Sequence, residues 1–131
     1  MEPQDATVIV TRADRKKGQS LARHLRADGF QVFEAHDAHE LIAACRAFFS
    51  SEDKLPDVVI TDIGLSDMTG LQAVEELRRD GGSAPPFILI TPSDDYRSFM
   101  AAERLGAAYV FENSPDDGAL RNAVFSLTRA W

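Results

Sequence analysis

The chain has 131 residues, and its 14 Lys and Arg against 21 Asp and Glu give a formal net charge of −7. This length predicts one domain over residues 1–131, and the acidic balance disfavours direct nucleic-acid binding, which needs clustered Lys and Arg. No apolar run approaches the roughly 18 residues of a membrane span. The single cysteine, Cys45, excludes an internal disulfide. We therefore expect a cytoplasmic domain without membrane contact.

Short apolar segments predict five strands. Three uninterrupted runs rich in β-branched residues lie at residues 7–10, 58–61 and 87–90. Runs of this kind are typical of strands that are buried on both faces of a parallel sheet. Two weaker candidates lie at residues 31–35 and 109–111.

Five stretches with helical spacing of apolar residues alternate with these strands. Their apolar positions are Leu21 and Leu25; Leu41, Cys45 and Phe48; Leu71, Val74 and Leu77; Phe99, Ala102 and Leu105; and Leu120, Val124 and Leu127. Asp37 is the expected N-cap of the second helix. Gly29 and Gly106 are expected just after the first and fourth helices, and the third should stop before residues 81–82. Pro115 is expected at the start of the last helix.

Regular alternation of strands and helices predicts an α/β domain, with a five-stranded parallel sheet and helices on both faces. In such a sheet, a site forms beyond the carboxyl ends of the strands, where the strand order reverses. The residues that end or follow the first, third and fourth strands are Thr11, Arg12, Ala13, Asp14, Asp62 and Thr91. Asp62 ends an apolar strand, where a carboxylate is costly unless it is paired or takes part in chemistry. A helix-capping or loop role for Asp62 is the alternative.

Several enzyme motifs are absent from the sequence. There is no GxGxxG after the first strand and no GxxxxGK[ST], which disfavours a dinucleotide enzyme and a P-loop NTPase. There is no GxSxG, which disfavours a hydrolase triad. We therefore do not expect an enzyme.

The segment from Pro56 to Gly70, PDVVITDIGLSDMTG, resembles the phosphoacceptor segment of receiver domains of two-component response regulators. Weaker similarity extends over residues 21–32, 86–91 and 105–110, in the same order and spacing as in that family. The resemblance implies a single flavodoxin-like (βα)5 domain with strand order 2-1-3-4-5. It also implies that Asp62 is the phosphoacceptor, and that Thr91 and Tyr109 are the switch residues.

The sequence departs from the family at the residues that support phosphorylation. Receiver domains carry two acids after the first strand, which hold Mg²⁺ together with the phosphoacceptor. Here these positions fall on Arg12 and Ala13, and a shift of one residue adds only Asp14. The resemblance therefore leaves Asp62 and Asp14 as metal ligands, and we expect no cofactor or at most weak Mg²⁺ binding.

The lysine that contacts the phosphoryl group in the family is also missing. Its position falls on Asn113 or on Glu112, depending on the alignment. Because phosphoryl transfer needs positive charge around the phosphoryl oxygens, we expect impaired phosphorylation. Arg12 and Asp62 are candidates for a bidentate ion pair, which would satisfy the carboxylate without a metal. An Arg12 that points to solvent is the alternative.

The favoured hypothesis is an atypical receiver domain that acts through protein–protein contacts. The resemblance implies a sensor kinase or an output domain as partner, and a homodimer through the fourth helix, fifth strand and fifth helix. The charged residues of that surface are Arg97, Arg104, Asp116, Asp117 and Arg121. Two alternatives stay open: a functional phosphoreceiver with an unusual site at Asp62, and a flavodoxin-like domain that binds a nucleotide or another small ligand in the crevice.

Overall fold

A computed structural model describes residues 2–52, 55–79, 85–92 and 94–129. Five strands and five α-helices alternate along the chain, after a short 3₁₀ turn at Pro3–Asp5. The elements are β1 (Thr7–Thr11), α1 (Arg15–Ala27), β2 (Gln31–Ala35), α2 (Ala38–Glu52), β3 (Val58–Asp62), α3 (Gly70–Arg79), β4 (Phe87–Thr91), α4 (Tyr96–Arg104), β5 (Tyr109–Glu112) and α5 (Asp117–Thr128). All five predicted strands are therefore confirmed, including the two weaker ones.

The strands form one parallel sheet in the order β2-β1-β3-β4-β5. One row across the sheet contains Glu34, Val10, Ile60, Ile88 and Tyr109. The three central members of this row are almost fully buried, as expected for strands covered on both faces. The predicted fold class and strand order are confirmed.

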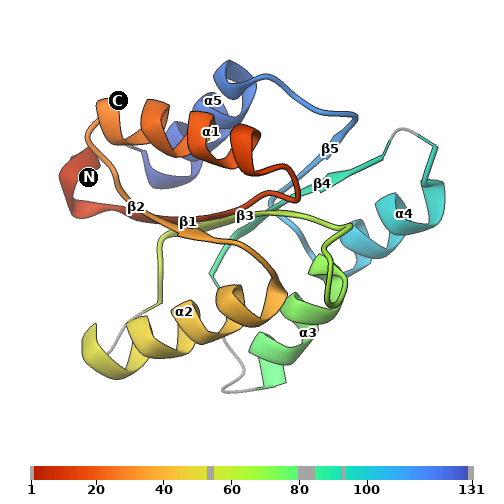
Figure 1. The fold of residues 1–131 in the computed structure, drawn as a ribbon. Helices are drawn as coiled ribbons and strands as arrows, with labels where there is room; N and C mark the ends of the chain where they lie inside the picture. Colours follow the sequence, from red (N-terminus) through yellow and green to blue (C-terminus); the bar gives the residue numbers. More distant parts are fainter. Residues whose placement is uncertain (1, 53–54, 80–84, 93, 130–131) are drawn as a thin grey trace.

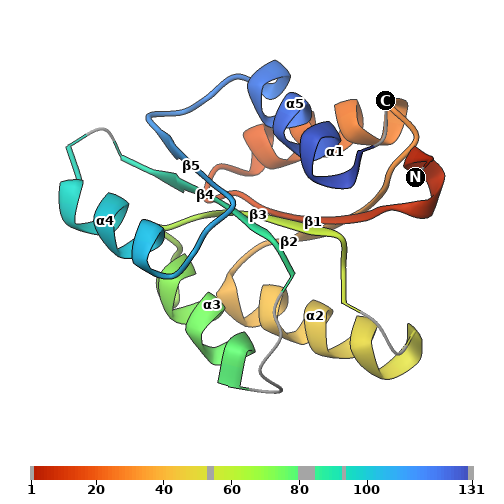
Figure 2. The same cartoon turned by 180° about the vertical axis from the view of Figure 1, so that it is seen from behind.

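The helices cover the sheet in two layers. Figures 1 and 2 show α1 and α5 on one face, and α2, α3 and α4 on the other. Alternation along β1 separates the two cores: Val8 and Val10 pack with Leu21 and Leu120, whereas Ile9 packs in the opposite core. Right-handed crossovers account for this arrangement, because the chain moves from β1 to β2 in one direction and from β2 to β5 in the other.

Local signals set most of the helix ends. Asp37 Oδ1 accepts a hydrogen bond from the backbone N of Glu40 at 2.8 Å, as predicted for an N-cap. Gly29 has a φ of 105°, the left-handed conformation expected just after a helix.

The start of the last helix differs from the prediction. Helix α5 begins at Asp117 with Asp116 as its N-cap, so that Pro115 precedes the helix. The Asp116 carboxylate accepts from the backbone N of Ala119, and this bond sets the first turn in place of the proline. The expected stop of the third helix at residues 81–82 lies outside the described residues.

Within the described ranges, no helix combines the length and apolar character that crossing a membrane requires.

Candidate functional site

A crevice of about 430 Å³ opens at the carboxyl end of the sheet. It lies where the chain leaves β1, β3, β4 and β5, at the point where the strand order reverses between β1 and β3. The crevice brings together six residues that the sequence singled out: Arg12, Ala13, Asp14, Asp62, Thr91 and Asn113. The crevice therefore lies at the edge of the sheet where the sequence predicts a site.

Asp62 ends β3, and one of its oxygens carries two hydrogen bonds. The Oδ2 atom accepts from the backbone N of Ala13 at 2.7 Å and from Nε of Arg12 at 3.2 Å. The loop between β3 and α3 folds back against the end of β3, and Gly70 allows this close approach. A Cβ at position 70 would lie only 2.5 Å from the Asp62 carbonyl oxygen. The glycine that closes the segment is therefore required by a close backbone approach.

Arg12 is buried although it is charged. Only 3% of its side chain is exposed, against 15% for Asp62. Its Cβ and Cγ atoms lie 3.5 and 3.7 Å from the position that a Cβ would take at Gly18, so the arginine stem packs next to this residue. The predicted pairing of Arg12 with Asp62 is present, but it runs through Nε alone and is not bidentate. The backbone N of Ala13 is the second donor, and it donates to the same oxygen as Arg12.

Two further residues complete the site, and the sequence reasoning missed both. Nη2 of Arg12 lies 3.4 Å from Oγ of Ser114, and Nζ of Lys17 also donates to that hydroxyl. Lys17 comes from the first turn of α1 and Ser114 from the loop after β5. A lysine therefore reaches the crevice from α1, although none follows the fifth strand. The family that the sequence resembles has a proline directly after this lysine. The available signal was therefore Pro115, which follows Ser114.

These donors do not fit a divalent cation such as Mg²⁺, which takes oxygen ligands in near-octahedral geometry. The guanidinium of Arg12 lies against the carboxylate, and Ala13 has no side-chain oxygen. Asp14 lines the crevice, but its Oδ1 caps α1 by accepting from the backbone N of Lys16 and Lys17 at 2.9 and 3.2 Å. A cation could therefore reach Oδ2 of Asp62 only if Arg12 moved away.

The two predicted switch residues lie on neighbouring strands. Thr91 ends β4 with 1% exposure, and its hydroxyl donates to the carbonyl of Pro92 at 3.4 Å. Tyr109 begins β5 with 36% exposure, stacks on Phe111 and donates from its hydroxyl to Ser126 Oγ at 3.0 Å. Both side chains therefore have partners of their own in this structure.

The two positions considered for the missing lysine differ in their placement. Asn113 lines the crevice and has a φ of 61°, in the left-handed region that asparagine tolerates. Glu112 is exposed at the end of β5, where it is in register with Thr91, and it does not line the crevice. Of the two, only Asn113 reaches the site.

The residues predicted for the interface lie on α4 and in or next to α5. Arg97 and Arg104 are exposed on α4, and Asp116 caps α5. Asp117 accepts from Ser20 Oγ at 2.7 Å and lies 2.7 Å from Nδ1 of His24.

Arg121 also contacts α1, at the residue that caps its C-terminal end. Its Nε and Nη2 donate to the two oxygens of Asp28 at 2.7 and 2.6 Å. Asp117 and Arg121 therefore hold α5 against α1, and their assignment to an interface with another molecule stays a prediction.

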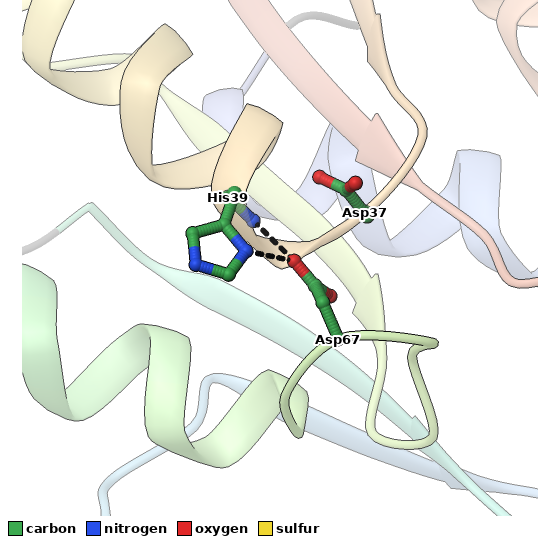
Figure 3. A group of neighbouring side chains, drawn as sticks. All are labelled: Asp37, His39 and Asp67. Carbon is green, nitrogen blue, oxygen red and sulfur yellow. Dashed lines mark hydrogen bonds and ion pairs between the residues drawn. The ribbon is translucent and has the colours of Figure 1, made fainter.

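A second polar cluster lies between the loop after β3 and the start of α2, and Figure 3 shows its members Asp37, His39 and Asp67. The Asp67 carboxylate accepts from the backbone N of Ala38 and His39 at 3.0 and 2.9 Å, and also from the imidazole of His39. Partial desolvation raises the pKa of Asp67, but these hydrogen bonds outweigh it and hold the pKa well below its ordinary value. Because these oxygens are engaged with N–H groups, the cluster ties the loop after β3 to the start of α2.

A family model described as the response regulator receiver domain matches residues 8–125. The chain belongs to this family. The probable transcriptional regulatory protein TcrX of Mycobacterium tuberculosis is 32% identical over 103 residues, which cover 79% of this chain and 41% of that protein. Protein PilH of Pseudomonas aeruginosa is 26% identical over 120 residues, which cover 91% of this chain and 94% of PilH.

Solved receiver structures share the fold of this receiver domain. A response regulator receiver domain protein from Clostridium thermocellum superposes with a TM-score of 0.79 at 21% identity, over 95% of this chain and 94% of the other. The chain spans between 41% and 57% of the length of the first curated relatives that it matches. The family match and the shared fold together make this chain a two-component receiver domain with a flavodoxin-like fold.

Proposed function

We propose that this receiver domain is an atypical member of its family, which signals through protein–protein contacts with impaired Mg²⁺-dependent phosphorylation of Asp62. The pairing of Arg12 with Asp62 is the observation that carries the proposal. A buried guanidinium stands where the family places acids, and it occupies the oxygen of the carboxylate that also accepts from Ala13. Arg12 therefore balances the negative charge of Asp62 without a metal.

The charge on Arg12 opposes phosphorylation in two ways. It repels a divalent cation, and it lowers the nucleophilicity of the carboxylate by hydrogen bonding to the charged form. Besides Asp62, the acid among the described residues that line the crevice is Asp14, and its Oδ1 caps the start of α1.

The partner surface that we propose lies on α4 and β5. Arg97 and Arg104 are exposed there, and Tyr109 presents a partly exposed ring. A sensor kinase, an output domain or a second copy of the chain would use this surface. Light scattering over a range of concentrations tests self-association, and a monomeric mass throughout would contradict the homodimer.

Intact mass spectrometry after incubation with acetyl phosphate and Mg²⁺ tests the central part of the proposal. We expect little or no gain of a phosphoryl group, whereas a receiver domain with both acids and the lysine, run in parallel, should be labelled. Stoichiometric labelling that Asp62→Asn abolishes would instead establish the alternative of a functional phosphoreceiver.

A further inference from the structure

Two cations converge on one neutral oxygen in the crevice. Nη2 of Arg12 and Nζ of Lys17 both approach the hydroxyl oxygen of Ser114. Hydrogen bonds from cations to an ionised acceptor are about twice as strong as those between neutral groups. The hydroxyl therefore occupies a position that would suit an oxyanion better.

The sequence concentrates positive charge at this place in an otherwise acidic chain. Arg12, Arg15, Lys16 and Lys17 supply four of the 14 Lys and Arg within six residues. Three of them stand in the first turn of α1, which contains no acid. Cations are unfavourable there, because the N-terminus of a helix is its positive end. Residues that go against a local structural preference in this way are often found at functional sites.

The two carboxylates of the crevice each accept hydrogen bonds through one oxygen. Asp62 accepts from Arg12 and Ala13, and Asp14 accepts from two backbone N–H groups of α1. Lys17 has no carboxylate partner among the described residues. Its side chain is therefore available to an anion in the crevice.

We propose that the crevice binds a phosphate dianion, free or as a phosphomonoester group, non-covalently and without metal, through Arg12 and Lys17. One phosphate oxygen takes the place of the Ser114 hydroxyl between the two cations, and the hydroxyl turns to donate to the phosphate. The proposal rests on the proposed function, since it requires that Arg12 keep a metal ion out. The crevice volume of about 430 Å³ lies within the range of ligand sites, which is roughly 300–1,000 Å³.

The test is a titration of the 131-residue chain, treated with EDTA, with inorganic phosphate and in parallel with phenyl phosphate. Amide shifts in ¹⁵N-resolved NMR spectra report the dissociation constant, and NaCl at equal ionic strength corrects for screening. We expect saturable binding of at least one probe, with shifts around Arg12, Lys17 and Ser114. Tighter binding of phenyl phosphate would identify a phosphomonoester as the ligand, and tighter binding of inorganic phosphate would identify the free ion.

Lys16 provides a matched control, because it carries the same charge in the same helical turn but does not line the crevice. We expect Lys17→Gln to weaken binding about tenfold, the effect of losing one charged hydrogen bond, and Lys16→Gln to change it less than about twofold. Equal weakening by both variants would mean general attraction by the basic turn, and would overturn the proposal. Absence of binding in EDTA would also overturn it.

Failure of this proposal is distinguishable from failure of the proposed function. If phosphate does not bind and acetyl phosphate with Mg²⁺ still leaves Asp62 unmodified, only the phosphate site is wrong. If Asp62 becomes phosphorylated, the proposed function is wrong whatever the titration gives.

Discussion

Nε of Arg12 lies 3.2 Å from Oδ2 of Asp62, across 50 positions of sequence, and only 3% of the arginine side chain is exposed. The two residues leave adjacent parallel strands, because β1 and β3 are neighbours in the sheet. Removal of one partner from a buried pair leaves the other charge without compensation. This relationship therefore makes the stability of the domain depend on a residue that the family does not normally place there.

We predict that Arg12→Ala lowers the free energy of unfolding by about 3 kcal/mol, near the lower end for a broken buried pair, because Asp62 keeps its bond to Ala13 and some solvent contact. Urea denaturation measures the change. Arg12→Met retains the stem that packs at Gly18 and isolates the effect of the charge. Arg15→Ala is the control, since this exposed residue should change stability by less than about 0.5 kcal/mol. An equally small loss for Arg12→Ala would show that the pair is incidental.

We predict that Arg12→Asp combined with Ser114→Lys restores binding of Mg²⁺ with beryllofluoride, which mimics a phosphoryl group. The first change removes a competing cation and adds a carboxylate beside Asp62. The second supplies a lysine at the position before Pro115, without placing it at the left-handed φ of Asn113. Without metal the double variant should be less stable than the parent, because two carboxylates then repel each other.

Thermal melts check this prediction. At ligand concentrations of 100 times the dissociation constant, stabilisation of about 2.7 kcal/mol is expected, and this raises the melting temperature by at least about 5 °C. The parent chain should not shift. Arg15→Asp with Ser114→Lys has the same total change of charge, but its aspartate lies at a position that does not line the crevice. A shift of equal size in this variant would contradict a role for position 12.

Arg121 provides a prediction about the contact between α1 and α5. Its bidentate hydrogen bonds to Asp28 raise the pKa of the guanidinium, and 37% of its side chain remains exposed. We predict that Arg121→Met lowers the free energy of unfolding by about 1 kcal/mol, near the upper end for an exposed pair because the geometry is bidentate. The loss should shrink in 1 M NaCl. Arg97→Met on the exposed face of α4 is the control, and an equal loss there would deny a specific role to the pair.

The sequence was sufficient for the fold and for the location of the site. Short β-branched runs that alternate with helical spacing leave few topologies, and Asp62 at the end of one such run marks the carboxyl edge. The pairing of Arg12 with Asp62 followed because both residues leave strands that are adjacent in the expected order.

The contacts that the sequence did not reveal depend on side-chain direction. Lys17 reaches Ser114 across 97 positions, and the spacing of apolar residues does not say which residues of a first helical turn face a loop. Asp117 and Arg121 are four residues apart, and so share one face of α5. That face lies against α1, because α5 covers the same side of the sheet as α1 (Figures 1 and 2).

The Asp67 carboxylate should make the stability of the domain depend on pH in the acid range. Hydrogen bonds from Ala38, His39 and Met68 keep its pKa below the ordinary value, despite partial desolvation that acts in the opposite direction. A carboxylate whose pKa is lower in the folded state stabilises the fold fully above its unfolded pKa of about 3.9, and this contribution is lost as the pH falls below that value. Asp67→Asn should therefore reduce the free energy of unfolding at pH 6, with a smaller effect at pH 3. Urea denaturation at both pH values measures the difference, with the exposed Asp94→Asn as control. A loss of equal size at the two pH values would mean that the charge of Asp67 does not hold the loop after β3 to α2.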